Sequence, residues 1–142
     1  MAINIRSAIK SGLISGLIIN LSAITMVPVV GNEMDAVLSA LGLPALSIMA
    51  MVFFSMISFI FGISLVFLYA LVKEHLGAGI KTAIIASGIF WFITYFISNV
   101  SLVVYGFMPV RLTVIGTAWG LGELLLAGIV GFRLYKEANL KQ

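Results

Sequence analysis

One carboxyl group, that of Glu123, stands inside an otherwise apolar stretch, TAWGLGELLLAGIVG at 117–131. If this stretch crosses a bilayer, a charged side chain at its centre costs about 2.5–3.5 kcal/mol on insertion scales. A protonated acid costs less, so we expect Glu123 to be neutral at rest. Intramembrane acids often mark ion or proton pathways, so Glu123 is the first candidate for chemistry.

Asn20 is the candidate partner of Glu123. It lies about ten residues beyond Lys10, at a depth in its own apolar stretch comparable to that of Glu123. An amide can both donate to and accept from a protonated carboxyl, so a hydrogen bond between the two would satisfy both groups. We therefore expect an intramembrane polar pair that pins two helices together, worth about 0.6–2 kcal/mol. Proton transport or cation binding by Glu123 stays open as the alternative.

Three aromatic residues suggest a second kind of site. Trp119 lies one turn before Glu123, and Trp91 and Tyr95 lie in the preceding apolar stretch. Together they could line an apolar pocket for a lipid tail or a quinone, although aromatic residues at this spacing are more often ordinary core or lipid-facing residues.

Other chemistry finds little support in the sequence. There are no cysteines, and the single histidine, His75, cannot form a metal cluster or supply two haem ligands. No nucleotide-binding or hydrolase motif is present, since the glycines do not follow strands. We therefore expect a protein that is not an enzyme and that carries no metal and no cofactor.

The elements that position these residues are membrane helices. Of the 142 residues, 62% are hydrophobic and 9% are charged, against about 25% charged in a typical soluble domain. Charged residues are absent from 11–32, 36–72 and 82–110, and 112–132 contains only Glu123. About 20 apolar residues suffice to cross a bilayer. We predict an all-α polytopic membrane protein, a compact four-helix bundle forming one domain over 1–142, with helices at about 5–30, 45–72, 80–106 and 111–136.

The first predicted loop contains Gly31, Asn32 and Pro44 as breakers, and its middle, EMDAVLSAL, could form a short interfacial helix. Soft similarity between AIKSGLISGLI and GIKTAIIASGI, and between GISLVFLY and GIVGFRLY, suggests a duplicated helical hairpin.

Basic residues predict the orientation. With the N-terminus inside, the cytoplasmic side receives seven of them, Arg6, Lys10, Lys73, Lys81, Arg133, Lys136 and Lys141, and the other side receives only Arg111. This bias predicts cytoplasmic N- and C-termini in a bacterial inner (plasma) membrane. The net charge of +3 gives no nucleic-acid face, because the basic residues stand at the ends of apolar stretches.

Small residues mark the faces on which helices can approach closely. The first helix has Gly12 and Gly16 at a spacing of four, followed by Asn20. The last helix has Gly116, Gly120, Glu123 and Ala127 on one face. We expect both sets to serve helix packing.

The segments SGLISGLIINL, GISLVFLYALV and AWGLGELLLAG resemble a loose group of small, uncharacterised bacterial four-helix integral membrane proteins. The resemblance implies the topology and no activity. Small multidrug transporters also have four helices and an essential acid, but theirs lies in the first helix, which has none here.

The function that we expect from the sequence is that of an accessory or structural subunit of a membrane complex, or of a homo-oligomer. Its partners would be membrane lipids and other membrane subunits or a second copy of itself, and not nucleic acid. The alternatives are a small proton-coupled transporter or channel centred on Glu123, and a lipid or quinone binder.

Overall fold

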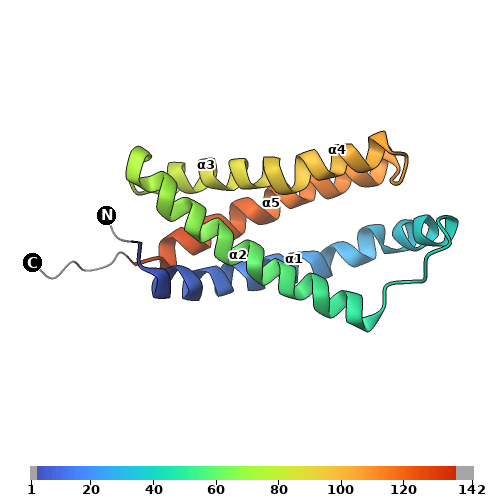
Figure 1. The fold of residues 1–142 in the computed structure, drawn as a ribbon, viewed down its shortest axis with the longest axis horizontal. Coiled ribbons are helices and arrows are strands. Elements are labelled where there is room, and N and C mark those ends of the chain that lie inside the picture. Colours follow the sequence, from blue (N-terminus) through green and yellow to red (C-terminus); the bar gives the residue numbers. More distant parts are fainter. Residues whose placement is uncertain (1–2, 137–142) are drawn as a thin grey trace, which may run out of the picture.

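The computed structural model describes residues 3–136, and they form the predicted all-α bundle (Figure 1). The helices are α1 (Ile5–Ala40), α2 (Ile48–Leu76), α3 (Ile80–Trp91), the π-helix η1 (Phe92–Phe96), α4 (Ile97–Val104) and α5 (Val110–Leu134). Because α3, η1 and α4 run on as one span, the described chain has four helices long and apolar enough to cross a membrane. The protein is therefore a multi-pass membrane protein of the predicted fold class.

The first helix is longer than predicted. It was expected to end near residue 30, but α1 continues through Pro28 and Gly31 to Ala40, so EMDAVLSAL extends α1 and is not a separate helix. Gly31 keeps a helical backbone, whereas Gly42 adopts a φ of 70°. There the Leu43 N–H bonds to the Leu38 carbonyl, which is the pattern of a glycine C-cap. The other helix ends differ from the predicted ones by at most four residues.

The last helix is the centre of the bundle. Helix α5 contacts every other described helix, whereas α1 contacts α2 and α5 but neither α3 nor α4. In Figure 1, the α3–α4 span lies along one side of α5 and α1 lies on its other side, while α2 crosses the view diagonally and its C-terminal end reaches the start of α3. Residues 3–10, 73–82 and 131–136 meet at one end of the bundle, which we name the terminal end. Residues 33–48 and 104–111 form the opposite end.

Tight packing is concentrated in the half of the bundle near the terminal end. One buried cluster consists of Ile19, Leu65, Leu124 and Ala127, and a second, closer to the terminal end, of Tyr69, Ala83 and Ala86. By contrast, α4 has no buried residue, and α2 has none before Gly62. Toward the opposite end, α2 and α4 therefore leave apolar side chains for lipid, whereas α1 and α5 still bury Val30 and Leu112.

Candidate functional site

Glu123 lies at the junction of three helices. Its side chain is 7% exposed, and it accepts a hydrogen bond from the Tyr95 hydroxyl of η1. The Ser22 hydroxyl of α1 lies near the same carboxyl. Ser22 in turn accepts a hydrogen bond of 2.9 Å from the indole Nε1 of Trp119. The carboxyl therefore has two hydroxyls beside it, from helices on opposite sides of α5.

The π-helix brings Tyr95 to this position. Within η1 the Ile97 N–H bonds to the Phe92 carbonyl, five residues back, and this wider turn changes the phase of the side chains that follow. Tyr95 and Asn99 therefore face α5, as does Trp91, which directly precedes the π-helix. The Trp91 indole donates to the Thr117 carbonyl at 2.8 Å, and the Asn99 amide donates to the Thr117 hydroxyl at 2.8 Å.

Gly120 makes room for the Tyr95 ring. A Cβ atom added at Gly120 would fall 2.5 Å from Cδ1 of Tyr95, a distance that real Cβ contacts do not show. The bare backbone of α5 at Gly120 therefore forms the surface on which the Tyr95 ring lies, three residues before the carboxyl that it reaches.

A cavity of about 190 Å³ adjoins the Glu123 carboxyl. It is lined by residues of α1, η1, α4 and α5: Ala23, Met26, Tyr95, Asn99, Gly116, Trp119, Gly120 and Glu123. Met26, Asn99 and Gly116 lie nearer the opposite end than Glu123 does, so the cavity extends from the carboxyl in that direction. We name it the Glu123 cavity.

Toward the terminal end, the site is closed by packed side chains. Ile19, Leu124 and Ala127 belong to the buried cluster on that side. The Ser15 hydroxyl adds a hydrogen bond of 2.9 Å from α1 to the Ala127 carbonyl of α5. At the opposite end, α1 and α5 are joined by an exposed ion pair between Glu33 and Arg111. The carboxyl thus has a dense layer on one side and a hollow on the other.

The expected pair between Asn20 and Glu123 is not formed. The Asn20 amide donates instead to the Gly16 carbonyl at 3.1 Å and to the Ser55 carbonyl of α2 at 3.3 Å. Two residues along an α-helix turn the side chain by about 200°, so Asn20 faces α2 while Ser22 faces Glu123. The prediction placed the two residues at matching levels along their helices but chose the wrong face of α1, and it missed Ser22 because a serine carries no distinctive signal in a membrane helix.

Asn20 lines a different hollow, a groove of about 430 Å³ between α1 and α2. Apart from Asn20, Ser55 and Ser58 its lining is apolar, with Ala23, Ile24, Val27, Leu46, Met51 and Phe54. The groove and the Glu123 cavity share Ala23 as a wall, but Asn20 lines only the groove, on the side of α1 opposite to Ser22.

The small residues occupy several different contacts within the chain. Gly12 and Gly16 lie against Ile63 and Phe59 of α2, where a Cβ at Gly16 would fall 2.6 Å from the Phe59 Cα. Ala127 is fully buried, but Gly116 lines the Glu123 cavity with only Met26 nearby. The glycines of α1 therefore face α2 and do not join those of α5 in one stripe.

The three aromatic candidates divide in the same way. Tyr95 and Trp119 line the Glu123 cavity, whereas Trp91 does not. Trp91 packs against the cluster around Leu124 and contacts the Phe96 ring.

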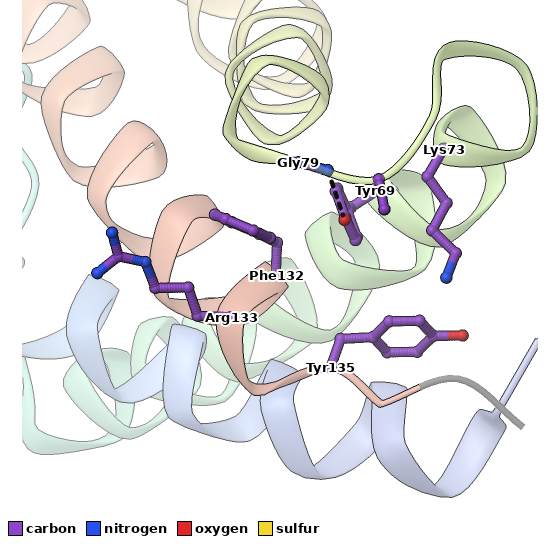
Figure 2. Close-up of a pocket in the computed structure, with 7 residues that line it drawn as sticks. Tyr69, Lys73, Gly79, Phe132, Arg133 and Tyr135 are labelled. Carbon is purple, nitrogen blue, oxygen red and sulfur yellow. Dashed lines mark hydrogen bonds between the residues drawn. The ribbon is translucent and has the colours of Figure 1, made fainter.

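The terminal end has a separate cavity of about 410 Å³, shown in Figure 2. Its walls include Tyr69, Phe132 and Tyr135, and the Gly79 N–H lies 3.4 Å from the Tyr69 hydroxyl that accepts its hydrogen bond. The Lys73 amine lies 4.7 Å from the centre of the Tyr135 ring, a cation–π contact. In Figure 2 the Arg133 side chain points away from Lys73. The described residues contain no group of three or more His, Cys, Asp or Glu side chains that could hold a metal ion.

Comparison with known proteins gives no family model, no curated protein and no solved structure that matches this chain. What the chain does must therefore be argued from the Glu123 site and the bundle that holds it.

Proposed function

We propose that the protein is a small, non-enzymatic membrane transporter in which Glu123 exchanges a proton for a small organic cation. The observation that supports this proposal is the carboxyl itself, buried between helices and bordering a cavity. Its hydrogen-bond donor is the Tyr95 hydroxyl, and no basic side chain within residues 3–136 pairs with it. A carboxylate in this position needs a proton or a bound cation to become neutral.

The shape of the site supports exchange better than a static hydrogen bond. A purely structural acid would be enclosed by protein on all sides, whereas Glu123 borders a hollow of about 190 Å³. That hollow extends toward one end only, and packed residues close the other side. A carboxyl with a hollow on one side and a packed layer on the other is suited to alternating access.

The lining fits a small ammonium ion. The carboxylate would supply the charge, and the aromatic faces of Tyr95 and Trp119 can attract a cation within about 6 Å of a ring centre. The Asn99 side chain adds a polar group toward the opposite end of the cavity. Protonation of Glu123 would remove the attraction and release the ligand.

The arrangement of basic residues supports the expected orientation, with the terminal end in the cytoplasm of a bacterial cell. Six basic residues lie at the terminal end: Arg6, Lys10, Lys73, Lys81, Arg133 and Lys136. Arg111 lies at the opposite end, where it pairs with Glu33. Lys141 lies outside the described residues. Under the positive-inside rule this distribution favours cytoplasmic termini, and the Glu123 cavity would then extend outward.

Transport can be tested in proteoliposomes that contain a pH-sensitive dye. Adding tetramethylammonium outside, an ion that has no membrane-permeant neutral form, should drive proton efflux through the wild-type protein. Glu123→Gln should abolish this flux, because an amide cannot release a proton, whereas Glu33→Gln, a change of an exposed acid, should retain it. Equal flux through both variants would refute the proposal.

A second candidate function is that of a subunit in a membrane complex or a homo-oligomer. It is favoured by the first half of α2, whose apolar residues are exposed, among them Ile48, Met49 and Met56. Gly12, Gly16 and Gly120 are used inside the chain, so lateral association would involve this half of α2. Mass spectrometry of the gently solubilised protein would decide, since stoichiometric partner subunits or a defined homo-oligomer would favour this candidate and a monomer would favour the transporter.

A further inference from the structure

A second hollow at the terminal end has a lining unlike that of the Glu123 cavity. Its volume is about 490 Å³, and it lies between the start of α1 and the residues that follow α5. It is lined by Asn4, Arg6, Ser7, Lys10, Ser11, Leu134 and Lys136. We name it the α1 basic cavity, because three of these residues are cations and none is acidic.

The three cations have no anionic partner in the described chain. The side chains of Arg6, Lys10 and Lys136 form no ion pair or hydrogen bond with residues 3–136. Arg111 at the opposite end, in contrast, pairs with Glu33. Three positive charges around one hollow repel each other, and an anion bound between them would relieve that repulsion.

Hydrogen bonds hold the two walls of the cavity together. The Ser7 hydroxyl accepts a bond of 2.7 Å from the backbone N–H of Lys136. The Tyr135 hydroxyl accepts one of 3.1 Å from the backbone N–H of Asn4. These bonds fix Lys136 beside the first turns of α1, so the cations come from two segments held in register.

The outer face of α1 continues from the cations into apolar residues. Steps of four, three and four residues lead from Arg6 to Lys10, Leu13 and Leu17, which keeps them on one side of the helix. Leu13 is 43% exposed and Leu17 is 49% exposed. A ligand with its charge between the cations could therefore extend an acyl chain along this face into the bilayer.

We propose that the α1 basic cavity binds the phosphate group of an anionic phospholipid. Basic pockets between membrane helices are suited to such headgroups, and the apolar face below the cations accommodates a lipid better than a free phosphate. This site is independent of Glu123 and does not require the proposed transport.

Native mass spectrometry of the purified protein can test the site by titration with phosphatidylglycerol, phosphatidylcholine or inorganic phosphate. One phosphatidylglycerol molecule should bind tightly, and phosphatidylcholine at least tenfold more weakly. Lys10→Gln should weaken phosphatidylglycerol binding about tenfold, a loss of about 1.4 kcal/mol. Lys81→Gln removes the same charge from the same end outside this cavity, and should leave binding unchanged.

Three outcomes would overturn the proposal. Equal weakening by Lys10→Gln and Lys81→Gln would mean general attraction to the positive end, and equal binding of phosphatidylcholine would mean that the headgroup charge is not recognised. Full competition by inorganic phosphate at the concentration of the lipid would mean that the site takes a free anion. Lys10→Arg keeps the charge and should bind phosphatidylglycerol as the wild-type protein does. This control shows whether Lys10→Gln weakens binding through the lost charge or through a misfolded protein.

Discussion

Tyr95 donates a hydrogen bond to Glu123 from the one turn of π-helix in the described chain. The two residues come from neighbouring spans, and the Tyr95 ring lies against the bare backbone of Gly120, three residues before Glu123. The contact thus depends on three features: the wider turn of η1, the missing side chain at Gly120 and the carboxyl of Glu123. In the proposed function this contact holds the carboxyl at the inner end of its cavity.

Removal of the Tyr95 hydroxyl should destabilise the protein. Tyr95→Phe leaves the ring in place but deprives Glu123 of a donor, so we expect a loss of about 0.5–1.5 kcal/mol of unfolding free energy. Thermal unfolding in detergent measures the loss. Tyr105→Phe is the matched control, because Tyr105 is 74% exposed. If both variants have the same unfolding free energy, the hydrogen bond does not contribute to stability.

A methyl group at Gly120 should displace the Tyr95 ring. Gly120→Ala places a Cβ 2.5 Å from that ring. We therefore expect a lower free energy of unfolding and altered Tyr95 fluorescence or ring NMR signals. Gly122→Ala, two residues on, meets nothing within 4 Å and should be silent or slightly stabilising, since alanine favours helix. Equal effects from the two variants would contradict the assigned packing of Tyr95.

The closest approach of α1 and α2 should depend on Gly62. A Cβ at this position would fall 2.6 Å from the Gly16 Cα. The clashing atoms belong to the α1 backbone, so no flexible side chain can rotate away to relieve the overlap. Gly62→Ala should therefore separate the helices and cost about 1–3 kcal/mol, the usual range for overpacking. Gly88→Ala in α3, which has open space, is the control. Unchanged thermal stability of Gly62→Ala would contradict this helix interface.

Double-mutant cycles should distinguish Ser22 from Asn20 as the partner of Glu123. Ser22→Ala and Glu123→Leu should be coupled by about 0.6–1.7 kcal/mol, the range measured for hydrogen bonds between membrane helices. Asn20→Leu and Glu123→Leu should be additive within about 0.5 kcal/mol, because Asn20 bonds to α2 instead. Coupling of the Asn20 pair and none of the Ser22 pair would reverse the assignment.

The sequence predicted the four spans well, because long stretches without charge allow few alternatives to membrane helices. It misplaced the end of α1, since Gly31 and Pro28 are tolerated inside a helix and the decisive φ belongs to Gly42. The position of Glu123 along its helix could also be predicted, because depth follows from counting residues.

The partners of Glu123 could not be predicted in the same way. They depend on how α1 is rotated about its axis, and apolar residues on all sides of the helix leave that rotation undetermined. Asn20 was the more polar residue at the right depth, but the rotation directs Ser22 toward the carboxyl. The contact with Tyr95 also required the π-helix, which no local pattern indicated.

The central claim, that Glu123 gives up a proton when a cation binds, is tested most directly by infrared difference spectroscopy. Spectra of the reconstituted protein would be recorded with and without tetramethylammonium. The account predicts that binding removes a protonated carboxyl band and produces a carboxylate band, and that both changes vanish in Glu123→Gln but persist in Glu33→Gln. An unchanged carboxyl region in the wild-type protein, or the same difference bands in Glu123→Gln, would contradict it.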